Sequence, residues 1–88
     1  SREEAAHFVS QLTPELLANL ASLSIDPSGE ITSQLKSYRN HATALTIQWG
    51  RSDETVLKMR VLDSLVALPE NSTKTSFILQ DPRAPISK

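Results

Sequence analysis

The sequence contains no cysteine and only two glycines among its 88 residues. Without cysteine, the chain forms neither disulfide bridges nor thiolate zinc sites, the usual means of stabilising a very small domain. A cysteine-free composition also favours a reducing compartment. Gly29 and Gly50 are too few and too far apart for a glycine-rich phosphate-binding loop. The composition therefore predicts an intracellular, soluble protein without a bound cofactor.

Aromatic side chains and long apolar runs are scarce as well. Aromatic residues make up 5% of the chain and apolar residues 39%, below the ~45–50% typical of globular domains, a figure that includes glycine. No apolar run approaches the ~18 residues of a membrane span, and no secretory signal pattern opens the chain. The core of such a domain must be thin. We expect aliphatic helix faces, or a partner chain, to complete it.

The length fits a single domain. The chain begins without methionine and ends in the proline-containing stretch Asp81–Pro85, which is typical of a linker. These ends predict a domain excised from a larger protein, with one unit over residues 1–80 and a tail over residues 81–88.

The net charge of −1 conceals two oppositely charged regions. Residues 1–30 contain five acidic residues and one basic residue, whereas residues 31–62 contain five basic and two acidic residues. Opposite charges favour docking of the two regions, or head-to-tail association of two copies. A nucleic-acid surface normally carries a stronger basic excess than this.

Four segments carry helical signals. Apolar residues recur at helical spacing over residues 3–12 and 14–23, and Thr13-Pro14 separates these two helices by an N-cap and a first-turn proline. A third helix is predicted over 30–49, where the apolar positions are spaced 4, 3, 4, 3 and 4. These positions are Ile31, Leu35, Tyr38, Ala42, Leu45 and Trp49. A fourth helix is predicted over 53–68 and ends at Pro69.

Two segments also carry strand signals. Residues 42–49 alternate between apolar and polar or β-branched types, so a strand is the alternative to helix there. Residues 73–79 are typical of one short strand, which requires a neighbour to be stable. The predicted fold class is mainly α: a small four-helix bundle-like domain with a short C-terminal strand. Its interface candidates are Ile31, Leu35, Tyr38, Leu45, Trp49 and Phe77.

No arrangement of residues predicts catalysis or metal binding. His7 follows Glu3 and Glu4 by one helical turn, but further ligands are missing, and His41 is expected at the surface or at an interface. The stretch 26–30 lacks the repeated carboxylates of a calcium loop. We therefore predict that the chain has no catalytic, cofactor or metal site, although an accessory domain of an enzyme remains open.

The sequence favours a non-catalytic module for protein–protein interaction or oligomerisation, with a partner protein or a second copy as ligand. The alternative is a small helical nucleic-acid-binding domain that uses a basic patch of Lys36, Arg39, Lys58 and Arg60. Nucleic acid is disfavoured because no aromatic residues are interleaved with these basic residues for base stacking.

Overall fold

The computed structural model describes residues 2–39, 41 and 43–88 of the chain. Its helices are α1 (Arg2–Ser10), α2 (Pro14–Asn19), α3 (Thr55–Ala67) and the 3₁₀ helix η1 (Pro69–Asn71). Its strands are β1 (Leu20–Ile25), β2 (Ile31–Leu35), β3 (Leu45–Gly50), β4 (Ser76–Ile78) and β5 (Ile86–Ser87). The fold is therefore α/β.

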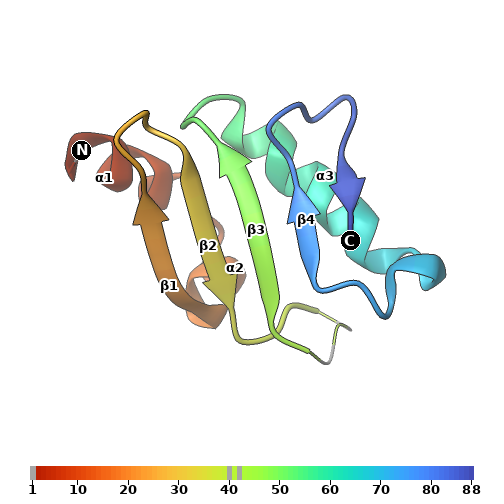
Figure 1. Cartoon of the computed structure of the whole chain (residues 1–88). Coiled ribbons are helices and arrows are strands. Elements are labelled where there is room, and N and C mark those ends of the chain that lie inside the picture. Colours follow the sequence, from red (N-terminus) through yellow and green to blue (C-terminus); the bar gives the residue numbers. More distant parts are fainter. Residues whose placement is uncertain (1, 40, 42) are drawn as a thin grey trace.

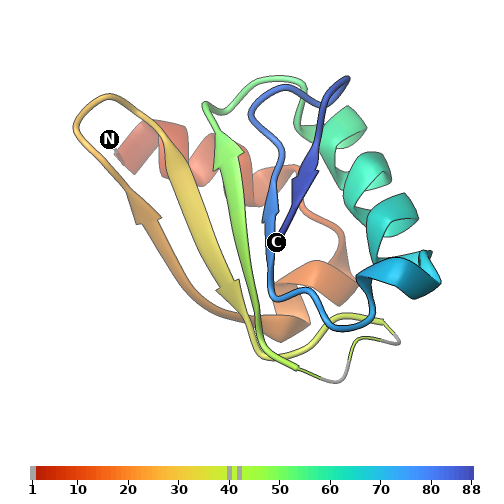
Figure 2. The ribbon, with the colours of Figure 1, turned by 45° about the vertical axis from the view of Figure 1, so that its right-hand side comes forward.

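The strands form one mixed sheet in the order β1-β2-β3-β4-β5 (Figure 1). Neighbouring strands are antiparallel except for β3 and β4, which are parallel. A parallel pair needs a crossover connection, and α3 supplies it between the end of β3 and the start of β4 (Figure 2). Consequently β1 and β5 are the two edges of the sheet.

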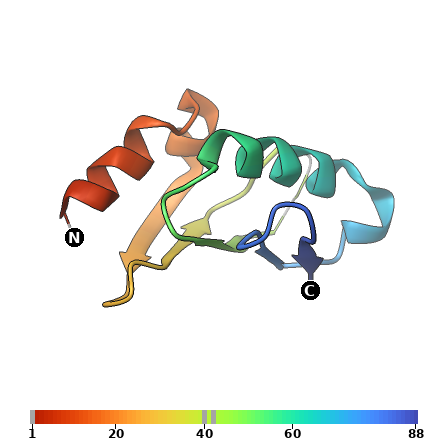
Figure 3. The ribbon, with the colours of Figure 1, turned by 90° about the horizontal axis from the view of Figure 1, so that it is seen from above.

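The helices lie on one face of the sheet and leave the other face open (Figure 3). The core fills the space between them. Phe8 from α1 packs its ring edge-to-face on Trp49 from β3, with ring centroids 5.2 Å apart. Leu16 from α2 and Leu62 from α3 are fully buried in the same cluster. Each helix thus covers the sheet with one apolar side.

The predicted four-helix bundle is wrong, because residues 30–49 form two strands and their connection instead of one helix. Ile31 and Leu35 point into the core from β2, and Leu45 and Trp49 do so from β3. A spacing of four residues places side chains on one face of a helix and also on one face of a strand. The coiled-coil seam therefore does not exist, and Ala42, one of its positions, lies outside the described residues.

The other predicted elements agree with the structure in part. The helices predicted over 3–12 and 53–68 agree with α1 and α3, and β4 lies within the segment predicted as a short strand. The helix predicted over 14–23 stops at Asn19, where β1 follows directly. The tail over 81–88 contributes β5, which pairs antiparallel with β4.

A three-residue turn joins β1 to β2. The Gly29 amide donates to the Asp26 carbonyl at 2.9 Å, and the Asp26 amide donates to the Glu30 carbonyl at 3.0 Å. Gly29 has a φ of +90°, as expected for the left-handed residue that closes this kind of hairpin loop. Hydrogen bonds from the Ser28 side chain and nearby backbone amides lower the pKa of the Asp26 carboxyl. The turn thereby fixes the register of the two strands.

One buried polar contact links β2 and β3 inside the core. The indole Nε1–H of Trp49 donates to the Ser33 hydroxyl at 2.8 Å, and both residues are at most 1% exposed. A buried donor that loses its acceptor retains its desolvation cost. The Ser33 hydroxyl therefore satisfies the indole N–H and makes a tryptophan tolerable at this buried position of the sheet.

We predict that Ser33→Ala destabilises the domain by about 1–3 kcal/mol, because the indole N–H of Trp49 stays buried without an acceptor. Chemical denaturation followed by fluorescence measures the change, since Trp49 is the only tryptophan. Ser24→Ala, at an exposed serine of β1, is the control and should change stability by less than about 0.5 kcal/mol. Equal effects of the two substitutions would contradict the prediction.

Candidate functional site

The first edge of the sheet, β1, has an unpaired side. Among residues 2–39, 41 and 43–88, only β2 pairs with this strand. Six residues with no charge and no proline form it: Leu20, Ala21, Ser22, Leu23, Ser24 and Ile25. Proteins usually protect such an edge with charges, proline or a covering segment. A long uncharged edge strand is therefore a candidate binding surface.

The backbone groups of β1 face alternately toward β2 and away from it. Asp26 and Glu30 form a hydrogen-bonded pair at the turn, and hydrogen-bonded and non-hydrogen-bonded pairs alternate along an antiparallel ladder. Ser24, opposite Thr32, accordingly directs its amide and carbonyl to β2. Leu23 and Ile25 direct theirs to the unpaired side. We call these outward groups of Leu23 and Ile25 the free edge.

The side chains beside the free edge differ between the two faces of the sheet. Leu23 and Ile25 lie on the helix side, where they pack against the core but remain partly exposed. Ser22 and Ser24 lie on the open side and are exposed. A strand added at this edge would meet a strip of half-buried apolar side chains on one face and hydroxyls on the other.

A β-bulge limits the regular part of this edge. Leu20 pairs with Leu35 and Ser22 with Gln34, so Ala21 is an extra residue in β1. Bulges bend an edge strand and interrupt its ladder. The region that can accept a partner strand in regular geometry therefore runs from Ser22 to Ile25.

The opposite edge, β5, has fewer backbone groups available for pairing with another strand. Strand β5 has two residues and follows Pro85. Ser76 and Lys88 exchange both backbone hydrogen bonds, at 3.1 and 2.8 Å. By the same alternation, Ser87 directs its amide outward. A two-residue strand with one outward residue is too short to template a stable strand pair.

The open face of the sheet is polar over β1, β2 and β3, has Ile78 and Ile86 on β4 and β5, and carries no charge on its strand residues. Its side chains on β1, β2, β3 and β4 are Ser22, Ser24, Thr32, Gln34, Thr46, Gln48, Ser76 and Ile78. The Thr46 hydroxyl donates to the Gln34 side-chain oxygen at 2.9 Å, which ties neighbouring strands together. These strand residues include no aromatic side chain for stacking bases and no basic side chain for charge-assisted phosphate contacts.

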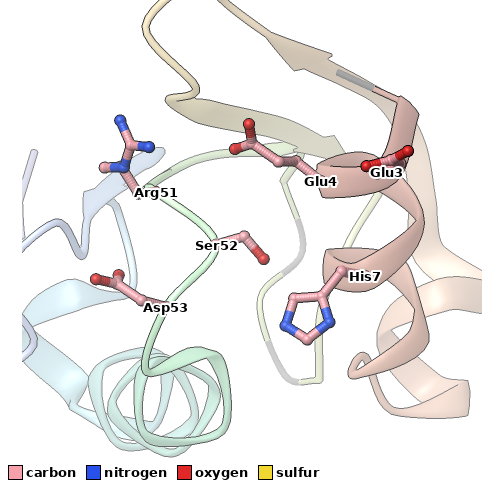
Figure 4. A pocket seen from close by; sticks show the side chains of 6 residues that line it. All are labelled: Glu3, Glu4, His7, Arg51, Ser52 and Asp53. Carbon is pink, nitrogen blue, oxygen red and sulfur yellow. The ribbon is translucent and has the colours of Figure 1, made fainter.

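A polar pocket lies between α1 and the loop that follows β3 (Figure 4). Its wall on α1 consists of Glu3, Glu4 and His7, and its wall on the loop of Arg51, Ser52 and Asp53. The Arg51 guanidinium donates to the Ser28 carbonyl at 2.6 Å, so this cation is held by the β1–β2 turn. The pocket is open and bears charges of both signs.

Two features bear on the chemistry of this pocket. The Ser52 hydroxyl has no hydrogen-bond partner among the described residues, so it forms no nucleophile–base pair with His7. The part of the chain that the structure describes holds no cluster of three or more histidine and carboxylate side chains able to bind a metal ion.

The six interface candidates from the sequence all lie in the core. Ile31, Leu35, Tyr38, Leu45, Trp49 and Phe77 are each at most 1% exposed. They are inaccessible to a partner as long as the domain stays folded. Their apolar character reflects packing beneath the helices.

Of the four residues predicted to form a basic patch, Lys58 is buried. Lys58 is 1% exposed, and its ammonium group donates to the Arg51 carbonyl at 3.1 Å and to Asp53 at 3.0 Å. Arg39 forms ion pairs with Glu15 and Asp63. Lys36 and Arg60 are exposed, one after β2 and one on α3. The ammonium group of Lys58 therefore contributes no charge to a basic surface.

Tyr38 contacts two of the residues in these ion pairs, Arg39 and Asp63. Its hydroxyl donates to the Asp63 carboxylate at 2.7 Å, and the Arg39 guanidinium lies 5.5 Å from its ring centroid. Burial, together with the hydrogen bond and the charge of Asp63, raises the pKa of Tyr38 to about 12. The contact joins the loop after β2 to α3.

We predict that the phenol of Tyr38 titrates near pH 12 in the folded domain. Because its pKa is higher in the folded than in the unfolded state, stability is unaffected below about pH 10 and falls between about pH 10 and 12. Ultraviolet absorbance measures the titration directly, since Tyr38 is the only tyrosine. Tyr38→Phe should remove this pH dependence. Ionisation near pH 10 with the fold intact would contradict the prediction.

Sequence reasoning missed the free edge because it assigned Leu20 and Leu23 to a helix. The available signal was the alternation of serine with apolar residues over Ser22–Ile25, followed by the turn at Asp26–Gly29. A strand ending in such a turn, with only one hairpin partner, indicates an edge.

Comparison with known protein families, with curated proteins and with solved structures finds no match to this chain. In the described residues, no helix is both long and apolar enough to cross a membrane.

Proposed function

We propose that this domain is a non-catalytic protein interaction module that binds an extended polypeptide strand along β1. The observation that carries this proposal is the free edge: Leu23 and Ile25 direct their amides and carbonyls away from β2. Main-chain hydrogen bonds to such an edge provide affinity, and side chains at alternate positions provide specificity.

The surroundings of the free edge support this mode of binding. Leu23 and Ile25 are partly exposed apolar residues on the helix side, so a bound strand gains hydrophobic contact in addition to hydrogen bonds. The exposed serines on the other side offer hydroxyls without charge repulsion. The short β5 and the mixed-charge pocket offer neither combination.

The test is a titration of the isotope-labelled domain with a capped heptapeptide of alternating threonine and valine. We expect the amides of Leu23 and Ile25 to gain protection from hydrogen exchange at millimolar peptide, because they acquire acceptors. The amides of Ser22 and Ser24 already face β2 and should keep their protection. Protection confined to another segment, or none at millimolar peptide, would reject the proposal.

A pair of backbone variants sharpens the result. N-methylation of Leu23, introduced by chemical synthesis, removes one outward donor and keeps every side chain. We expect it to weaken peptide binding by about 1 kcal/mol, or roughly fivefold. N-methylation of Ser87, whose amide points out of the opposite edge, is the matched control and should leave binding unchanged.

A further inference from the structure

We infer that the strand bound along β1 is β1 of a second copy, so that two domains join their sheets about a two-fold axis at Ser24. This inference rests on the proposed function and specifies its ligand. It follows from the register of the free edge, from the faces of β1 and from the charges at the two ends of the β1–β2 hairpin.

The register selects Ser24 as the centre. In an antiparallel pair, the residues that exchange hydrogen bonds both face the partner strand. Centring on Ser24 sets Leu23 of each copy opposite Ile25 of the other, so the outward groups of both residues are used. Centring on Leu23 would place Ile25 opposite Ala21 of the bulge. Centring on Ile25 would place Leu23 opposite Pro27, which has no amide hydrogen to donate. Two-fold pairing at Ser24 uses the same residues on both copies and closes the assembly at two.

The faces of the strand match in this register. Residues directly opposite each other in an antiparallel pair lie on the same face. Ser24 of one copy therefore faces Ser24 of the other on the open side, and Leu23 faces Ile25 on the helix side. Ser22 lies opposite Asp26, which is exposed. Neither face acquires a buried charge.

The charges at the ends of the hairpin are complementary in the same arrangement. Asp26 and Glu30 flank the turn, whereas Lys36 follows β2 at the other end, where its amide donates to the Asn19 carbonyl at 2.8 Å. Lys36 is exposed and forms no ion pair with any described residue. Antiparallel pairing brings the acidic end of one copy within about two strand spacings, ~10 Å, of the basic end of the other, comparable to the Debye length at physiological salt.

The test is the mass of the domain across a concentration series, measured by sedimentation equilibrium. Because the regular contact spans only Ser22–Ile25, we expect a weak, transient dimer with a dissociation constant between about 10 µM and 1 mM. The variant S24K places like charges opposite each other at the two-fold axis and should weaken dimerisation about fivefold.

Charge reversal checks the register. In the arrangement centred on Ser24, the variant S22K sets each lysine opposite Asp26 of the other copy, so it should dimerise at least as well as the natural chain. An equimolar mixture of S24K and S24E should restore dimers, because each lysine then faces a glutamate. The matched control is Q48K, which adds the same charge to the open face of β3 and should leave dimerisation within about twofold. Far-ultraviolet circular dichroism verifies that each variant is folded.

The outcomes separate this inference from the function on which it rests. A chain that stays monomeric at millimolar concentration while the peptide still protects Leu23 and Ile25 overturns the second-copy inference and leaves the strand-binding function standing. Dimers that are insensitive to S24K overturn the inference as well, because another surface then forms the contact. Loss of both peptide binding and dimerisation overturns the two together.

Discussion

The register of the β1–β2 hairpin is the constraint on which the core, the open face and the free edge all depend. The turn at Pro27–Gly29 sets it through the reciprocal position of Asp26 and Glu30. A slip of one residue would turn Leu23 and Ile25 to the open face and bury serines beneath the helices. It would also exchange the backbone groups that face outward. Gly29 permits this turn through its positive φ, and the guanidinium of Arg51 holds the turn from the other side.

The sequence allowed α1, α3 and the short strand β4 to be predicted, but not strands β1 and β2. Thr13-Pro14 and Pro69 mark helix boundaries by local chemistry that tertiary packing does not alter. In β2, by contrast, the inward-facing positions are not all apolar. Ser33 lies between Ile31 and Leu35 on the inward face, and this polar residue is buried because its hydroxyl accepts a hydrogen bond from Trp49. A polar residue between Ile31 and Leu35 is also typical of the solvated face of a helix, so the four-residue spacing of these two residues resembled a helix.

The candidate site was concealed by the bulge in β1. Leu20 and Leu23 are three residues apart, an odd spacing that normally places strand side chains on opposite faces. The extra residue Ala21 restores both leucines to the same side of the sheet, where Leu20 pairs with Leu35 and Leu23 with Ser33. A bulged strand therefore imitates the spacing of a helix. Local periodicity cannot distinguish the two cases, because the bulge is identified only from its partner strand.

The same bulge determines what kind of association the edge supports. Without it, an uncharged strand of six residues would present three outward residues in regular geometry, which favours unlimited strand addition. With Ala21 displaced and Asp26 at the end of the strand, the regular part is confined to Ser22–Ile25. A two-fold pair consumes that part completely, and β5 at the far edge is too short to continue the sheet. Reversible pairing of two strands is thus compatible with this edge, whereas growth into a longer sheet is not.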